Sequence, residues 1–121
     1  MKVWQRSHAL VLQLYRLIQS LPADKRFGLV AQLRRGVISV PTNLAEGSKR
    51  EGSQDYARFL NIAEGSLVET ESLIMLSRDL EYVTPQSVGP VLAEIKEIAR
   101  MLHYLRLQVE RRAAAPAKRA A

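Results

Sequence analysis

Two glutamates in a hexapeptide that occurs twice are the residues best placed to do chemistry. The string NLAEGS spans residues 43–48 and NIAEGS spans residues 61–66, so Glu46 and Glu64 occupy equivalent positions. Two carboxylates on neighbouring helices can divide acid and base roles if their surroundings separate their pKa values. However, no histidine, cysteine or serine nucleophile is arranged near either glutamate, and Glu46 precedes Arg50 by four residues, the spacing of a helix ion pair. We therefore expect caps, ion pairs and packing here, with no catalytic residue and no enzyme activity.

The two histidines do not form a metal-binding pattern. A di-iron helical bundle needs Glu-x-x-His on two helices, but the residues three positions before His8 and His103 are Gln5 and Arg100. No phosphate loop, dinucleotide fingerprint or zinc-ligand spacing occurs either. We expect no metal and no cofactor.

The glycines of the two hexapeptides predict different structural roles. The apolar pattern ends after Gly47, so Gly47 is expected to stop a helix in the left-handed conformation of a C-terminal cap. The pattern continues after Gly65, so Gly65 is expected inside a helix, where another backbone or a bulky side chain approaches closely. The copies are therefore not a tandem repeat.

The overall composition indicates one domain without disulfides. The chain has 121 residues and no cysteine, which suits a reducing cytoplasm. It lacks a continuous apolar run long enough for a membrane span, and the N-terminal segment does not read as a signal peptide, so we expect a cytoplasmic location. The net charge is +6, but Arg111, Arg112, Lys118 and Arg119 lie in the last eleven residues, so a basic binding surface is only weakly indicated.

Apolar residues at helical spacing predict four helices. The first runs from about Val3 to Leu21, and the second begins near Asp24 as its cap. Pro41 interrupts the second, and we prefer one helix kinked at Pro41 over a short strand at residues 37–40 because the apolar phase is unbroken.

The remaining segments complete an all-α, antiparallel up-down four-helix bundle over residues 1–110. A polar turn at residues 47–53 leads to a third helix ending near Tyr82, and the fourth opens at Thr84-Pro85, with Ser87 as the alternative cap. Residues 111–121 form a basic, Ala/Pro-rich tail expected to be flexible.

Residues 27–74 carry the motifs of a known family. These motifs are Phe27-Gly28-Leu29, Gln32-Leu33-Arg34-Arg35, Ser39-Val40-Pro41-Thr42-Asn43-Leu44-Ala45-Glu46-Gly47, Phe59-Leu60 and Gly65-Ser66-Leu67 with Glu69. Through them the chain resembles the bacterial four-helix-bundle proteins first recognised as products of intervening sequences in 23S ribosomal RNA genes. The resemblance covers about residues 1–110.

The resemblance implies an up-down bundle that assembles into a ring, typically a homopentamer. It also implies kinship to accessory proteins of diversity-generating retroelements, which are thought to bind nucleic acid and a reverse transcriptase through basic surfaces. The family has no assigned reaction, so the matching residues are expected to be structural; they are Pro41, Asn43, Glu46, Gly47, Gly65, Ser66 and Glu69.

The sequence itself also favours self-association. Ile62, Val68 and Met75 lie outside the main apolar stripe of the third helix, and the first helix is apolar over much of its circumference. A second buried face explains these residues better than scattered surface hydrophobes do.

The function hypotheses are therefore two binding roles. The first is a homo-oligomer that binds RNA or DNA through basic residues, namely Arg34, Arg35, Lys49, Arg50, Arg58, Arg111 and Arg112. The alternative is an oligomeric scaffold that binds a protein partner, with the same residues only solvating the surface. No base-reading motif is present.

Overall fold

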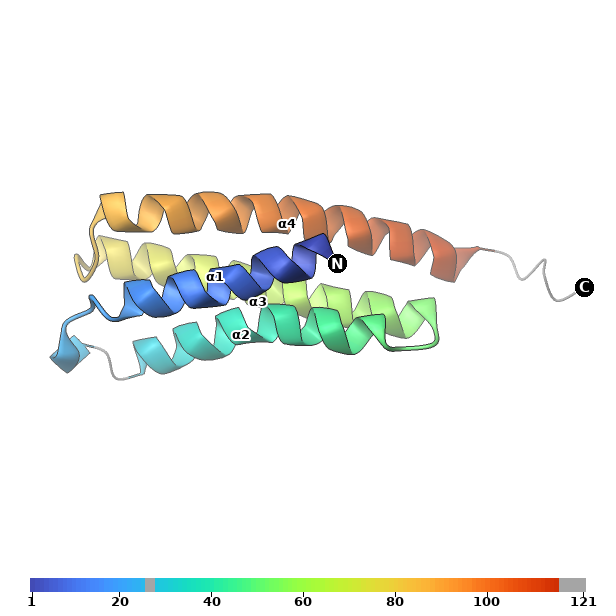
Figure 1. The fold of residues 1–121 in the computed structure, drawn as a ribbon, viewed down its shortest axis with the longest axis horizontal. Coiled ribbons are helices and arrows are strands. Elements are labelled where there is room, and N and C mark those ends of the chain that lie inside the picture. The colour runs from blue at the N-terminus through green and yellow to red at the C-terminus, as the bar shows by residue number, and fades with distance from the viewer. Residues whose placement is uncertain (26–27, 116–121) are drawn as a thin grey trace, which may run out of the picture.

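The chain forms four α-helices in an up-down arrangement (Figure 1). The structure is a computed structural model and describes residues 1–25 and 28–115. Helix α1 spans Lys2–Ile18, α2 spans Leu29–Ser48, α3 spans Ser53–Asp79 and α4 spans Pro85–Ala114, with a short 3-10 helix, η1, at Ala23–Lys25. The contacts join α1 to α2, α2 to α3, α3 to α4 and α1 to α4, so α1 and α3 are diagonal to one another.

The core is an aliphatic column to which every helix contributes. Its largest fully buried side chains include Leu10, Leu14 and Ile18 of α1, Leu33, Val37 and Leu44 of α2, Leu60, Leu67 and Ile74 of α3, and Ile95, Ile98 and Leu102 of α4. These residues recur at three- and four-residue spacing, which places them on one face of each helix. No helix in the described part of the chain is long and apolar enough to cross a membrane.

The short first helix leaves one end of the bundle open. At 1.5 Å per residue, α1 is roughly 25 Å long and α4 roughly 45 Å. The N-terminus of α1 consequently lies midway along the bundle, while the α2–α3 turn and the end of α4 project beyond it (Figure 1). We call this three-helix part the open end.

Pro41 lies inside α2, which is helical from residue 29 to residue 48. The strand considered for residues 37–40 is therefore wrong, whereas a continuous second helix is confirmed. The bend expected at Pro41 stays a prediction.

Three expected helix boundaries are wrong. Helix α1 ends three residues before Leu21, and α2 begins at Leu29 rather than near Asp24, because Asp24 belongs to η1 and the N-cap Gly28 has φ +79°. Helix α3 ends at Asp79, where Glu81 takes φ +64° and the amides of Glu81 and Tyr82 donate back to the carbonyls of Arg78 and Ser77. This pair of bonds is the Schellman motif that closes a helix.

The start of α4 is confirmed at Thr84-Pro85. The Thr84 hydroxyl accepts a hydrogen bond of 3.1 Å from the Ser87 amide, so Thr84 is the cap and Ser87 is not. At its other end α4 continues to Ala114, so Arg111 and Arg112 are helical although they were assigned to the tail. The division at residue 110 stays a prediction, and Lys118 and Arg119, like Phe27, lie outside the described residues.

Candidate functional site

The two glutamates of the repeated hexapeptide have separate partners. Glu46 accepts a 2.8 Å hydrogen bond from Arg50 on the exposed side of α2. Glu64 on α3 pairs with Arg106 of α4 and lies 3.4 Å from Nδ1 of His103. Hydrogen bonds from Arg106 to Glu64 and Glu110 raise the pKa of Arg106. Within residues 1–25 and 28–115, no group of histidines and acids could hold a metal ion.

The position of Gly65 inside a helix is confirmed, but the left-handed cap expected at Gly47 and the close approach expected at Gly65 are wrong. Gly47 is helical and buried, and a Cβ at this position would stand 2.7 Å from Cβ of Phe59 and 3.0 Å from the Tyr56 ring. Gly47 therefore allows α3 to approach α2. Gly65 is exposed, and nothing lies within 4 Å of a Cβ built on it. The close approach of another helix, which was expected at Gly65, occurs at Gly47 instead.

A polar seam joins α2 to α3 and uses several of the motif residues. The Ser39 and Ser66 hydroxyls are hydrogen-bonded at 2.7 Å, and Asn43 donates to the Ser39 carbonyl and hydroxyl. Gly36 lies beside this seam, since its Cβ would stand 2.8 Å from the Thr70 hydroxyl and 3.4 Å from the Glu69 carboxylate. Gly36 was not predicted from the sequence, because the position of a glycine in a helical segment does not show whether another helix packs against it.

The basic residues of the second helix and the turn after it, which the sequence suggested for nucleic-acid binding, lie at two separate places. Fifteen residues, or roughly 22 Å of helix, separate Arg35 from Arg50. The Arg34 guanidinium lies 5.3 Å from the centre of the Tyr15 ring, on the side of α2 that faces α1. Lys49 and Arg50 instead lie at the open end.

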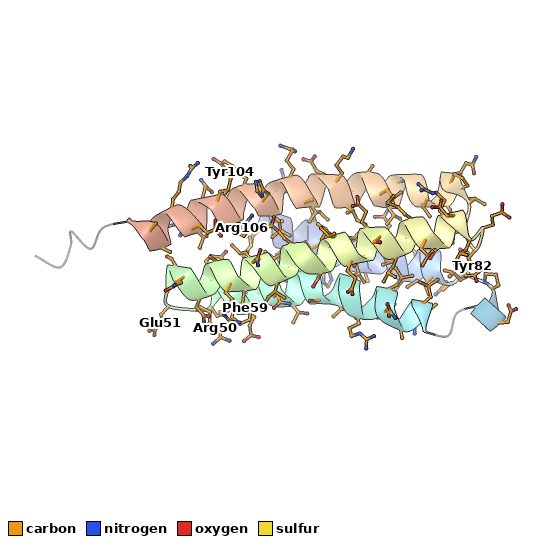
Figure 2. The ribbon with its side chains drawn as sticks, turned by 180° about the vertical axis from the view of Figure 1, so that it is seen from behind. Arg50, Glu51, Phe59, Tyr82, Tyr104 and Arg106 are labelled. Carbon is orange, nitrogen blue, oxygen red and sulfur yellow. The ribbon has the colours of Figure 1, made fainter. Side chains whose placement is uncertain are left out.

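The open end brings together five of the seven expected cations. Arg50 and Arg58 lie 4.8 Å and 4.5 Å from the centre of the Phe59 ring, and both reach Asp55, Arg50 at 3.6 Å and Arg58 at 2.8 Å. Arg50, Glu51 and Phe59 gather at this end of the bundle in Figure 2. Lys49 at the end of α2 and Arg111 and Arg112 in the last turn of α4 complete the set.

Tyr56 connects Arg112 to this cluster. Burial raises the pKa of Tyr56, and the positive charge of Arg112 acts in the opposite direction. The end of α4 lies against the start of α3, since Ala57 and Arg58 line a surface hollow together with Glu110 and Ala114. Arg111 and Arg112 are thus part of a helical surface.

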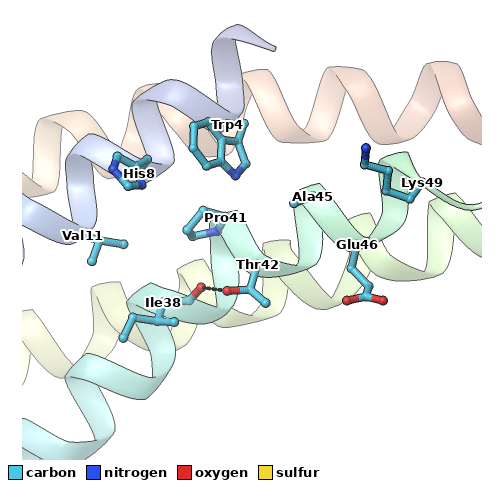
Figure 3. A pocket seen from close by; sticks show the side chains of 9 residues that line it. All are labelled: Trp4, His8, Val11, Ile38, Pro41, Thr42, Ala45, Glu46 and Lys49. Carbon is cyan, nitrogen blue, oxygen red and sulfur yellow. Dashed lines mark hydrogen bonds between the residues drawn. The ribbon is translucent and has the colours of Figure 1, made fainter.

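A second surface feature is an apolar groove between α1 and α2 (Figure 3). We call it the α1/α2 groove; its walls are Trp4, His8 and Val11 of α1 and Ile38, Pro41, Thr42, Ala45 and Glu46 of α2, with Lys49 at its end. The rings of Trp4 and His8 are stacked 5.0 Å apart. The groove holds about 570 Å³ and contains no nucleophile paired with a base.

Comparison with known proteins identifies the chain's relatives. The family model described as 23S rRNA-intervening sequence protein matches residues 1–104. The crystal structure of a protein of unknown function from the S23 ribosomal protein family of Bacteroides thetaiotaomicron is similar, with 25% sequence identity and a TM-score of 0.81. The match covers 86% of this chain and 97% of that one. A search of curated proteins found no match.

Proposed function

The chain belongs to the 23S rRNA-intervening sequence protein family, and from this premise we propose that it is a non-enzymatic homo-oligomer that binds RNA or DNA through the open end. The observation that carries the proposal is the set of unneutralised cations there. Lys49, Arg111 and Arg112 make no ion pair with a carboxylate in the described part of the chain. Phosphate groups are the anions such a surface attracts.

Two further cations support a phosphate surface. Arg50 and Arg58 both contact Asp55, Arg50 also pairs with Glu46, and both guanidinium groups make cation–π contacts with Phe59. Glu46 and Glu51 reduce the positive charge, so we expect modest affinity for one subunit. An assembly would repeat the surface once per subunit, and this multivalency increases the overall affinity.

Self-association is the second half of the proposal. Several large apolar side chains are exposed on the single chain, among them Leu12, Ile38, Ile62, Val68, Met75 and Leu76. Burying them between subunits removes apolar area from water. We expect a ring, with five subunits from the family resemblance, and light scattering gives the count.

Fluorescence anisotropy tests the nucleic-acid role. Labelled RNA and DNA are titrated with the wild-type protein, with a Lys49→Gln/Arg111→Gln/Arg112→Gln variant, and with Arg34→Gln/Arg35→Gln as a control roughly 22 Å away. We expect binding that weakens steeply with salt, and a salt slope smaller by about 2–3 in the triple variant, since each lost phosphate contact removes about 0.9. No binding at low salt would refute the proposal, and an equal loss in the control would move the site away from the open end.

The alternative is a scaffold for a protein partner. This alternative is supported by Arg50 and Arg58, which already have carboxylate partners within the chain. Cations that are paired in this way are less available to bind phosphate groups. Protein binding that is insensitive to salt, together with absent nucleic-acid binding, would favour this alternative.

A further inference from the structure

Besides the α1/α2 groove, the bundle carries an exposed apolar ridge on α3. This α3 ridge consists of Val68, Met75 and Leu76, whose exposed fractions are 64%, 40% and 46%. Gly65 and Ser72 lie on the same exposed side of α3, so the ridge stands clear of bulky neighbours. When a complementary surface covers apolar side chains that are exposed to this degree, the removal of apolar area from water stabilises the complex.

The groove and the ridge lie on different sides of the molecule. α1 and α3 are diagonal in the bundle, and α1 faces the viewer in Figure 1, whereas α3 faces the viewer in the reverse view of Figure 2. A ridge therefore cannot enter the groove of its own chain. It can enter the groove of another copy, which is a heterologous contact that repeats until a ring closes.

The charges on the two surfaces are complementary. Arg34 lies over the Tyr15 ring on the side of α2 that faces α1, and Lys49 stands at the end of the groove, whose acidic lining residue is Glu46. On α3, Glu69 and Glu71 flank the ridge and make no ion pair in the described part of the chain, whereas the other three acids of this helix are already paired. Opposite charges favour placing α3 of one copy on α1 and α2 of another, and they disfavour pairing either face with itself.

From this placement we infer that the α3 ridge of one copy docks in the α1/α2 groove of the next, so that each copy uses both surfaces. The inference rests on the proposed self-association and specifies its interface. Ile38, Pro41 and Ala45 supply an apolar floor for Val68 and its neighbours. An isologous dimer, by contrast, would use one of the two surfaces twice and leave the other exposed.

Two single-surface variants test this pairing. Ile38→Glu places an acid in the groove, where it would meet Glu69 and Glu71 of the next copy. Val68→Lys places a cation on the ridge, where it would meet Arg34 and Lys49 of the next copy. Both positions are exposed in the single chain, so the bundle should fold, which circular dichroism checks. Tyr104→Lys, at an exposed aromatic residue of α4 away from both surfaces, is the matched control.

Light scattering and sedimentation then measure the mass of each protein and of an equimolar mixture. We expect the wild-type protein and Tyr104→Lys to assemble, and each single-surface variant to be monomeric. Mixing Ile38→Glu with Val68→Lys should produce one-to-one dimers, because an intact ridge meets an intact groove once. Neither variant alone can make that contact.

The other outcomes separate two kinds of failure. A wild-type chain that is monomeric at every concentration overturns both the self-association and this inference. If the wild-type protein assembles, three results overturn only the inference: assembly that survives either variant, two monomeric variants that do not pair on mixing, or dispersal by Tyr104→Lys.

Discussion

Gly47 and Gly65 follow the same Ala-Glu pair, but the space around them differs. Gly47→Ala would place a methyl group 2.7 Å from Cβ of Phe59, and overpacking of this kind costs about 1–3 kcal/mol, offset by about 1 kcal/mol of helix propensity. Gly65→Ala meets open space and should stabilise the protein by about 1 kcal/mol. Urea unfolding of both variants at one protein concentration measures the difference. Equal effects of the two alanines would contradict these packing roles.

Glu81 is a second residue held in a conformation that suits glycine. Its φ of +64° closes the Schellman motif after α3, and a side chain in the left-handed region costs roughly 1–2 kcal/mol. Glu81→Gly should therefore raise the free energy of unfolding by about 0.5–1 kcal/mol, since glycine also increases the entropy of the unfolded chain. Glu81→Ala removes the carboxylate without relieving the backbone and is the control. A gain of the same size from alanine would show that charge, not conformation, is responsible.

At the scale of elements, substitutions of Glu64 and Glu46 compare an ion pair that joins two helices with an exposed local one. Glu64 joins α3 to α4 through Arg106, and both side chains are about one-fifth exposed, at 21% and 19%. Glu64→Gln should destabilise the protein by about 1–2 kcal/mol, because a partly buried charged hydrogen bond is lost. Glu46 of α2 pairs with Arg50, which lies just beyond the end of that helix, and the two are 53% and 41% exposed. Glu46→Gln should therefore cost only about 0.3–0.5 kcal/mol. Thermal unfolding at neutral pH measures both, and a larger loss at Glu46 would contradict this ordering.

The helices themselves could largely be predicted from the sequence, because each buries one stripe of regularly spaced apolar residues. Their ends were less predictable. α2 begins late because a 3-10 helix takes up Asp24, and α3 ends early because Glu81 adopts a conformation that its residue type disfavours. The roles of Gly47 and Gly65 were also inaccessible, since they depend on whether an aromatic side chain from the next helix lies opposite.

The candidate surface was only partly predictable, because it depends on which distant segments of the chain lie together in the fold. The sequence placed Arg34, Arg35, Lys49 and Arg50 in one candidate set, but about 22 Å of helix separates Arg35 from Arg50. Lys49 lies at the same end of the bundle as Arg111 and Arg112 because α2 and α4 run in the same direction, although roughly half the chain separates them in sequence. The pairing of Glu64 with Arg106 likewise needs the packing of α3 on α4.

For the whole molecule, the excess of positive charge makes acid the condition that most threatens the fold. The chain carries 18 lysines and arginines against 12 acids, so protonating the acids leaves the cations to repel one another. Glu97 is an acid that links α4 to α1. It pairs with Arg100 on α4 and lies 3.8 Å from Arg6 of α1. The hydrogen bond from Arg100 holds the pKa of Glu97 below its ordinary value of 4.5, and the charges of Arg6 and Lys2 act in the same direction.

The sign of the pH dependence follows from that lowered pKa. At pH values well above 4.5, Glu97 is ionised in both the folded and the unfolded state, and its full contribution to stability is present. As the pH falls below this value the unfolded chain takes up the proton first, so the free energy of unfolding decreases until the folded pKa is passed. Urea midpoints measured from neutral pH to about pH 3 should therefore decline, and Glu97→Gln should flatten the acid part of the curve. Glu51→Gln, at an exposed glutamate of the α2–α3 turn, is the control and should leave the slope unchanged, whereas equal flattening by both variants would assign the acid sensitivity to net charge alone.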